Sequence, residues 1–174
     1  MDRDGVIVKE VNYLARVEDM TVIAGVADAI AKLREAGFKA IIISNQSAVA
    51  RGLLSLSGLK EITRVLRARL LDQNPRARLD AVYYCPHHPD FDKSCDCRKP
   101  ETGLILKAQK KFNIDLKSSY FVGDSSVDIL AARRSGCVPL LVKTGKAGKD
   151  GLYLEKPRKI FKSFPTAAGW ILRQ

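Results

Sequence analysis

The stretch Asp2-Arg3-Asp4-Gly5-Val6, near the start of the chain, indicates the fold and the chemistry more strongly than any other segment. Its two carboxylates stand two residues apart, and side chains at positions i and i+2 of a strand point to the same face. At the end of a strand, Asp2 and Asp4 can therefore converge on one metal ion and one phosphate group. Such a pair alone also fits a solvated acidic turn, so the interpretation depends on the residues that accompany it.

The rest of the chain alternates short apolar runs, typical of strands, with apolar residues at helical spacing. We expect a short strand over 21–23 and further strands over 39–44, 81–84, 120–122 and 138–142. Helices are expected over 26–36, 57–72 (capped by Ser57), 103–112 and 126–135, with a last helix beginning near Ser163. This alternation predicts an α/β fold in one domain over 1–174, with a Rossmann-like parallel sheet and helices on both faces.

Polar residues follow directly after several of these expected strands. They are Ser44 and Asn45, Asp124, and the run Thr144-Gly145-Lys146. Ligands of parallel sheets bind at the carboxyl ends of the strands, so these residues should gather with Asp2 and Asp4 at one edge. Only Met1 precedes Asp2, and we therefore expect that a buried first strand of about four or five residues is missing from the sheet, either because the true start lies upstream or because the strand was cut away.

Composition narrows the class of protein. The 174 residues are 46% hydrophobic and 28% charged, which is typical of a soluble globular domain with a substantial core. No apolar run is long enough to span a bilayer, and charged residues occupy the place of a secretory signal, so we expect a cytoplasmic protein. We also expect a monomer. The net charge of +11 comes from basic residues spread over several elements. This spread favours attraction of an anionic small substrate over nucleic acid as the main ligand.

Three of the four cysteines fall between positions 85 and 97, in the pattern Cys85-x-His87 followed by Cys95-x-Cys97. Three thiolates and one imidazole make a closed tetrahedral set, which is typical of structural zinc. A disulfide is the alternative, but Cys95 and Cys97 are too close in sequence to bridge easily, and no export signal is present. His88 competes with His87 as the fourth ligand. We expect a zinc-binding loop over 85–97 that fixes the basic residues following it.

The motifs D-R-D-G-V, S-N-Q (44–46), R-K-P (98–100) and G-D-x-x-x-D (123–128) resemble, in this order, the four motifs of the haloacid dehalogenase superfamily. Within it, S-N-Q-S-A-V-A-R-G, C-P-H-H-P and C-D-C-R-K-P resemble the D-glycero-D-manno-heptose-1,7-bisphosphate 7-phosphatases. The histidinol-phosphate phosphatases share the zinc loop but differ after the second motif, and they rank second. The resemblance implies a haloacid dehalogenase-like phosphatase fold without a large cap domain.

The resemblance also implies the roles of individual residues. Asp2 is expected to attack phosphorus and form an aspartyl-phosphate, with Asp4 as general acid and base. Mg²⁺ is expected on Asp2, the backbone carbonyl of Asp4, and Asp124, with Asp128 in support. Expected phosphate and substrate contacts come from Ser44, Asn45, Gln46, Ser47, Arg51, Arg98, Lys99, Glu10, Asn12 and Tyr13. His87 is favoured over His88 as the zinc ligand.

Departures from the family pattern bear on the substrate. Val8, Ala48 and Ser125 stand where relatives often carry Asn, Gly and a basic residue, respectively. The expected reaction is hydrolysis of a small sugar bisphosphate, most closely the 7-phosphate of D-glycero-D-manno-heptose 1,7-bisphosphate. The alternatives are a histidinol-phosphate phosphatase, or an inactive truncated relative that binds phosphorylated ligands or nucleic acid.

Overall fold

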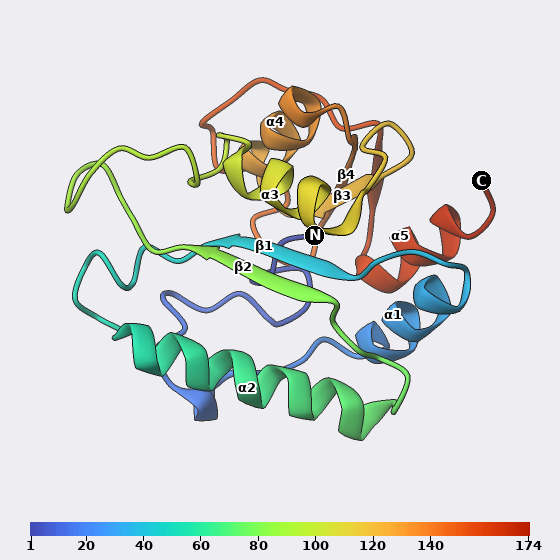
Figure 1. The fold of residues 1–174 in the computed structure, drawn as a ribbon, viewed down its shortest axis with the longest axis horizontal. Coiled ribbons are helices and arrows are strands. Elements are labelled where there is room, and N and C mark those ends of the chain that lie inside the picture. Colours follow the sequence, from blue (N-terminus) through green and yellow to red (C-terminus); the bar gives the residue numbers. More distant parts are fainter.

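The helices and strands alternate along the chain (Figure 1). In this computed structural model, which describes residues 1–174, the strands are β1 (Ile41–Asn45), β2 (Ala81–Cys85), β3 (Tyr120–Gly123), β4 (Val138–Val142) and β5 (Lys159–Phe161). The helices are α1 (Val26–Glu35), α2 (Leu56–Gln73), α3 (Gly103–Phe112), α4 (Ser126–Ser135) and α5 (Phe164–Ile171), with a short 3-10 helix, η1 (Val17–Asp19), before α1. The expected α/β class is confirmed, and no large cap domain is present.

All strand pairs are parallel, but they form two sheets rather than one. One sheet contains β1 and β2, and the other has the order β3-β4-β5. Met1 and Asp2 lie between the sheets: the N–H of Ile43 donates to the Met1 carbonyl at 2.9 Å, and the N–H of Asp2 donates to the Val122 carbonyl at 2.9 Å. The chain before Asp4 therefore contacts β1 on one side and β3 on the other.

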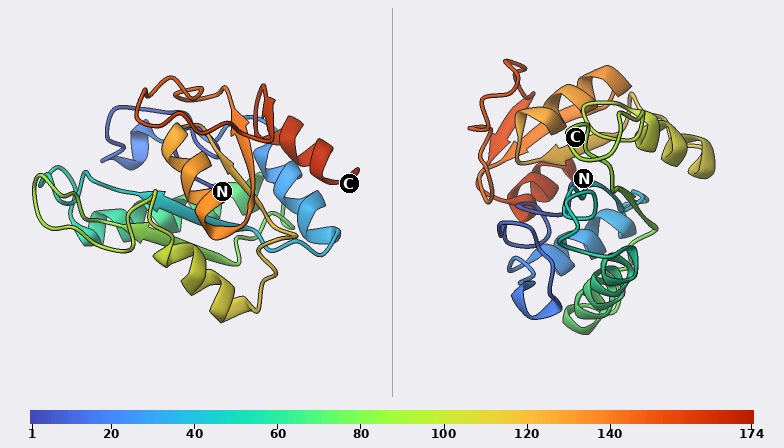
Figure 2. Two further views of the ribbon diagram at one scale, coloured as in Figure 1. Left: turned by 90° about the horizontal axis from the view of Figure 1, so that it is seen from above. Right: turned by 90° about the vertical axis from the view of Figure 1, so that its left-hand side faces the viewer.

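Alternate strand residues face two different groups of helices, as Figures 1 and 2 show. Ile41 and Ile43 of β1 pack in one cluster with Leu104, Ile105 and other residues of α3 and α4. Ile42, between them, belongs to the larger cluster that α1, α2 and α5 cover on the opposite face. The continuous apolar runs of these strands follow from this burial on both faces, which is usual for parallel sheets.

Three details differ from the expectations. Ser55, not Ser57, caps α2, where its side chain accepts a hydrogen bond from the N–H of Gly58. Residues 21–23 form only an isolated antiparallel bridge, between Val22 and Val8. The short strand β5 was not expected, because Lys159 and Ile160 are exposed and its three residues show no apolar run. No helix is both long and apolar enough to cross a membrane.

Gly5 makes the turn that follows the two aspartates. Its φ of +71° lies in the left-handed region, and a Cβ atom built there would stand 2.5 Å from a carboxylate oxygen of Asp124. Any other residue would therefore be strained by both its backbone and its side chain. Directly after the turn, Val6, Ile7 and Val8 are fully buried. This apolar anchor holds Asp2 and Asp4 on one side of the turn and the loop from Lys9 onward on the other.

Asp80, just before β2, joins the starts of two strands to α1. Its carboxylate pairs with Arg34 and accepts the N–H of Ala40 at 2.8 Å. Burial alone would raise the pKa of Asp80, but the hydrogen bonds from Arg34 and Ala40 outweigh burial and lower it. A carboxyl group with a lowered folded-state pKa contributes stability above its unfolded pKa of about 3.9, and that contribution is lost as the pH falls further.

We predict that Asp80→Asn lowers the free energy of unfolding at pH 7 by about 1–3 kcal/mol, because a charged hydrogen-bond acceptor is lost. The difference from the wild type should shrink below about pH 4, where the wild-type carboxylate is also protonated. Urea unfolding at pH 7 and pH 3 measures both effects, and Asp72→Asn, at an exposed position of α2, is the control. An equal difference at both pH values would contradict the assignment to charge.

Candidate active site

A polar cavity of about 340 Å³ lies at the carboxyl ends of the strands. It collects segments that are far apart in the sequence: the turn at Asp2 and Asp4, the loop after β1, the loop before α3, and the start of α4. Of the residues expected from the sequence, its lining includes Asp2, Asp4, Glu10, Asn12, Tyr13, Asn45, Gln46, Ser47, Arg51, Arg98, Lys99, Asp124 and Asp128. Ser44 does not line the cavity and lies buried beneath it.

Lys99 is the central cation of the site. Its side chain is 2% exposed, and its ammonium group lies 3.1 Å from Asp2 and 2.6 Å from Asp128. Burial alone would lower the pKa of Lys99, but the charges of Asp128 and Asp2 raise it above its ordinary value. Burial would likewise raise the pKa of Asp2, yet the charge of Lys99 and a hydrogen bond from Ser44 hold it low. The lowered pKa of Asp2 favours its ionised form beside Lys99.

Carboxylates outnumber cations in this part of the cavity. Oxygens of Asp2, Asp124 and Asp128 all lie within 4.8 Å of one another. Burial, followed by the charges of Asp128 and Asp2, raises the pKa of Asp124 to about 7. Lys99 contacts Asp2 and Asp128 but is not paired with Asp124. A group of oxygens with excess negative charge suits a hard divalent cation, and its composition fits Mg²⁺.

Asp4 lies on the same cavity but in a different environment. Its carboxylate accepts two hydrogen bonds from Arg3, at 3.0 and 2.8 Å, and one from the Gln46 amide at 2.8 Å. Arg3 is fully buried and also donates to Gln46 at 2.8 Å. Gln46 thus helps to orient Asp4, a role that the sequence did not indicate. The two aspartates of the first motif are held by different partners and can perform different tasks.

Asn45 holds the backbone of Lys99 in place. Its amide nitrogen donates to the Lys99 carbonyl, and its amide oxygen accepts the Lys99 N–H, both at 2.9 Å. Both hydrogen-bonding ends of the side chain are therefore occupied. Asn45 therefore has a positioning role, because it pins the end of β1 to the residue that supplies the central cation, and its expected contact with phosphate stays a prediction.

The outer part of the cavity carries Arg51 between two aromatic rings. Its guanidinium carbon lies 5.2 Å from the ring centre of Tyr13 and 4.2 Å from that of Phe91. The Nε atom of Arg51 is buried and has no hydrogen-bond partner. Arg98 lies on the same cavity and donates to the His87 carbonyl at 3.1 Å. This region can therefore receive a second anionic group at a distance from Lys99.

Two contributors to the site come from the loop after β4. Lys146 lines the cavity, and its N–H donates to Asp124 at 2.6 Å. Lys146 belongs to the run Thr144-Gly145-Lys146, which was expected at this edge of the sheet, but the sequence predicted no individual role for it. Asp150 accepts the N–H of Ser126 at 2.9 Å and its hydroxyl at 2.9 Å, and so fastens this loop to the start of α4. Asp150 stands in no motif, so no signal in the sequence pointed to it.

The cysteines of the 85–97 loop converge, but the histidines do not join them. Sulfur atoms of Cys85, Cys95 and Cys97 lie 2.9–3.5 Å apart, and none forms a disulfide. The His87 Nδ1 atom pairs with Asp92, and no histidine nitrogen belongs to the cysteine group. His88 contacts Phe91 edge to face, with ring centres 5.4 Å apart, and lines the active-site cavity. Three thiols at such spacing are chemically suited to a soft metal ion such as zinc.

Comparison with known proteins gives concordant matches. Residues 96–167 match a family profile described as HAD-hydrolase-like. The D-glycero-beta-D-manno-heptose-1,7-bisphosphate 7-phosphatase of Photorhabdus laumondii is 38% identical over 84% of this chain and 80% of its own length. The D-glycero-alpha-D-manno-heptose-1,7-bisphosphate 7-phosphatase of the same organism is 43% identical over 83% of this chain and 81% of its own length.

A solved structure extends the similarity to the fold. The D,D-heptose 1,7-bisphosphate phosphatase of B. bronchiseptica, complexed with magnesium and phosphate, has a TM-score of 0.86 and 30% sequence identity. The match covers 99% of this chain and 96% of that one. Nearly every element described above, including those that carry the polar cavity, therefore has a counterpart in a solved protein.

Proposed function

Because the chain belongs to the haloacid dehalogenase-like phosphatases, within the family of the D-glycero-D-manno-heptose-1,7-bisphosphate 7-phosphatases, we propose that it hydrolyses the 7-phosphate of that sugar bisphosphate. The observation that carries the proposal is the pairing of buried Lys99 with Asp2 at 3.1 Å in a cavity that also holds Asp124 and Asp128. Phosphoryl transfer needs a positioned nucleophile and positive charge around the phosphoryl oxygens, and this arrangement supplies both.

Asp2 is the nucleophile in this proposal. One of its carboxylate oxygens attacks phosphorus, the bond from phosphorus to the sugar oxygen breaks, and an aspartyl-phosphate forms. Lys99 keeps Asp2 ionised before the attack and neutralises phosphoryl oxygens during it. Ser44, which is buried and helps to lower the pKa of Asp2, supports the ionised form of the nucleophile.

Asp4 moves the proton in both steps. It gives a proton to the departing sugar oxygen, and then takes one from the water that attacks phosphorus and releases phosphate from Asp2. Arg3 and Gln46 fix the Asp4 carboxylate on the cavity wall and so hold it in position for both transfers. Because Arg3 is buried and has two hydrogen bonds to Asp4, the side chain of Asp4 is restricted to one orientation.

The carboxylate group fits Mg²⁺, which would be held by Asp2, Asp124 and the backbone carbonyl of Asp4, with Asp128 nearby. When bound, the ion supplies positive charge to the phosphoryl oxygens. Asp128 pairs with Lys99 and accepts a hydrogen bond from the Ser125 hydroxyl at 2.6 Å. It therefore fixes both the Lys99 ammonium group and the loop at Ser125. Burial raises the pKa of Asp124, and the charges of Asp128 and Asp2, which a cation would offset, raise it further.

The second phosphate of the substrate is proposed to lie near Arg51. A bisphosphate carries two anionic groups, and the cavity has cations at two places: Lys99 at its base, and Arg51 with Arg98 toward the outer part. The guanidinium group of Arg51, whose Nε has no hydrogen-bond partner within the protein, is proposed to donate to a phosphate oxygen. Hydrogen bonds to charged groups contribute about 1.5–3 kcal/mol, which corresponds to roughly tenfold to a hundredfold in affinity.

Phosphate release in the presence of Mg²⁺ tests the function. The panel contains the alpha and beta anomers of the heptose 1,7-bisphosphate, heptose 7-phosphate, fructose 1,6-bisphosphate and histidinol phosphate. We expect the highest kcat/KM for a heptose bisphosphate, and we expect Arg51→Met to lower kcat/KM for the bisphosphate roughly tenfold or more while affecting the monophosphate less. Highest activity on histidinol phosphate would assign the chain to that sister group, and no activity at all would favour an inactive binding protein.

We also propose that the 85–97 loop holds one structural zinc ion on Cys85, Cys95, Cys97 and His87. Support comes from the three converging thiols and from the proximity of the His87 backbone, whose carbonyl lies 3.9 Å from the Cys85 sulfur. Arg98 and Lys99 directly follow Cys97. A closed metal site here would stabilise the loop that presents both cations to the substrate.

We predict about one zinc per chain in protein purified without chelators, because the ligands suffice for one tetrahedral site. Stripping zinc should lower the melting temperature and the phosphatase rate together, since Arg98 and Lys99 lose their support. Cys85→Ser should lose the metal, and a comparison of His87→Ala with His88→Ala by metal analysis identifies the fourth ligand. Protein that contains no zinc, or that keeps its full melting temperature after stripping, would refute the site.

A further inference from the structure

The β4–β5 loop (residues 143–158) contributes a further cation to the active-site cavity. Lys146 lines the cavity from this loop, on an exposed stretch of chain. Its ammonium group forms no ion pair with any carboxylate of the protein. Lys99, by contrast, is paired with two carboxylates before any substrate binds. The charge of Lys146 therefore has no partner in the protein, although it borders the space that a substrate would occupy.

The backbone of Lys146 is packed against Asp124. Its N–H donates to the Asp124 carboxylate at 2.6 Å, and the N–H of Gly148 donates to the Asp124 carbonyl at 2.8 Å. The residue before Lys146 is Gly145, where a Cβ atom would stand 2.1 Å from the Asp124 carboxylate. Any larger residue there would push the loop away from Asp124. The side chain of Lys146 therefore begins directly beside a carboxylate that is proposed to hold Mg²⁺.

The same loop is also fastened to the start of α4. The Asp150 carboxylate accepts the N–H and the hydroxyl of Ser126, and the Ser126 hydroxyl accepts the N–H of Tyr153 at 3.1 Å. Between the two attachments, the N–H of Lys149 donates to the Lys146 carbonyl at 2.9 Å and closes a turn. Lys146 is therefore presented from a backbone that is held on both sides.

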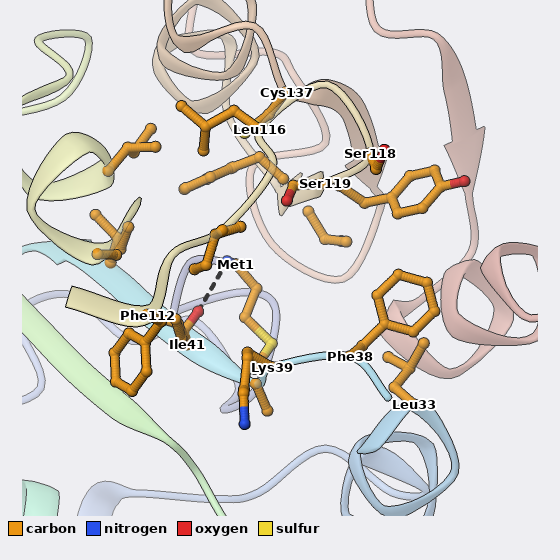
Figure 3. A pocket seen from close by; sticks show the side chains of 18 of the residues that line it. Met1, Leu33, Phe38, Lys39, Ile41, Phe112, Leu116, Ser118, Ser119 and Cys137 are labelled. Atoms are coloured by element: carbon orange, nitrogen blue, oxygen red, sulfur yellow. Dashed lines mark hydrogen bonds between the residues drawn. The ribbon is translucent and has the colours of Figure 1, made fainter. Parts of the chain in front are cut away.

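The charge of Lys146 acts inside the polar cavity. Burial and the charge of Asp4 raise the pKa of Glu10, which lines this cavity, and the charge of Lys146 opposes them. The cavity of about 390 Å³ in Figure 3 differs in chemistry: 18 of its 24 lining residues are hydrophobic, and Lys39 is its single lysine or arginine. The two cavities share no lining residue. An anionic group is therefore expected at the polar cavity.

We propose that Lys146 binds the phosphoryl group that Asp2 attacks, and that Asp150 is a positioning residue for Lys146. This inference rests on the proposed phosphatase function and adds a contact to it. Negative charge is spread over three phosphoryl oxygens during the transfer, so a single cation does not meet all of them. Lys99 supplies its ammonium group at the buried base of the cavity, and Lys146 supplies a second one from the exposed loop beside Asp124.

Binding of inorganic phosphate in the presence of Mg²⁺ tests this contact without turnover. The melting temperature is followed as phosphate is titrated at constant ionic strength, which gives a dissociation constant for each variant. We expect Lys146→Met to weaken phosphate binding roughly tenfold, because a charged hydrogen-bond donor is lost. Lys149→Met is the matched control: it removes the same charge from an exposed position of the same loop outside the cavity, and should change binding less than about twofold.

Kinetics identify which phosphate group Lys146 contacts. Heptose 1,7-bisphosphate and heptose 7-phosphate share the group that is transferred. Lys146→Met should therefore lower kcat/KM for both by a similar factor, whereas Arg51→Met is expected to affect the monophosphate less. A loss confined to the bisphosphate would overturn the proposal, because Lys146 would then serve the second phosphate.

The role of Asp150 is tested by combining variants. Asp150→Ala should weaken phosphate binding in the wild type but add little to Lys146→Met, since it acts through the same side chain. Full additivity would overturn the positioning role. If Asp150→Ala fails to fold, Asp150→Asn takes its place, because the amide keeps the size of the side chain and loses its charge.

Three results of the phosphate titration would overturn the contact with Lys146. They are unchanged binding in Lys146→Met, an equal loss in Lys149→Met, and no binding of phosphate by the wild type. The titration contains no sugar, so inactivity on every sugar phosphate would contradict the proposed function and leave the phosphate result standing.

Discussion

Replacing Asp2 with asparagine should reduce phosphate release by roughly 10³-fold or more while leaving the fold intact, since loss of a covalent nucleophile in other hydrolases costs up to about 10⁶-fold. The amide is nearly isosteric with the carboxylate but is a very poor nucleophile. The structure explains why the variant should still fold: Lys99 keeps its 2.6 Å contact with Asp128 when the charge of Asp2 is removed. Steady-state phosphate release and thermal unfolding measure the two parts of the prediction.

The comparison variant for Asp2→Asn is Asp19→Asn, which removes one negative charge from an exposed position of η1 and should retain full activity. Asp4→Asn provides a second comparison, because loss of a general acid and base typically costs about 10²–10⁴-fold. In Asp4→Asn the nucleophile is still present, so phosphate covalently bound to the protein should be detectable after quenching. Activity of Asp2→Asn within about tenfold of the wild type would exclude Asp2 as the nucleophile.

Local signals explain why much of the fold could be predicted from the sequence. The helices over 103–112 and 126–135 and the strand over 138–142 have the predicted bounds, because clear breaks flank their apolar patterns. Gly136, for example, ends α4 in the left-handed region with φ of +84°. The strand β5 gave no such signal, because its residues are largely exposed and it pairs only at the edge of the sheet.

The sequence predicted which residues gather at the candidate site where a motif directly follows a strand. It was less able to predict the task of a residue whose role depends on tertiary contacts. Asp2, Lys99 and Asp124 meet because parallel strands end at one edge, which the alternation of elements already implies. The tasks of Asn45 and Gln46 depend on partners 54 and 42 residues away, which no local pattern reveals. Asp128 is more central than expected, because it bonds directly to Lys99 in addition to supporting the loop at Ser125.

Lys99→Met should destabilise the protein by about 3–5 kcal/mol, the typical cost of removing one partner of a buried ion pair. Methionine is similar to lysine in length and fits an apolar environment, so the main change is the loss of charge. Asp2, Asp124 and Asp128 would then share one buried region without a protein cation. Urea unfolding measures the loss, and a change within about 1 kcal/mol would contradict the central role of this cation.

A second variant separates the electrostatic origin of this loss from simple repacking. Adding Asp128→Asn to Lys99→Met removes one of the uncompensated charges and should restore part of the stability, whereas Asp128→Asn alone should destabilise because it removes the shorter of the two Lys99 contacts. Mg²⁺ should raise the melting temperature of Lys99→Met more than that of the wild type, because the carboxylate group has lost its competing cation. Phosphatase activity should be lost in both Lys99 variants whatever their stability, since neither retains the cation that neutralises the phosphoryl oxygens.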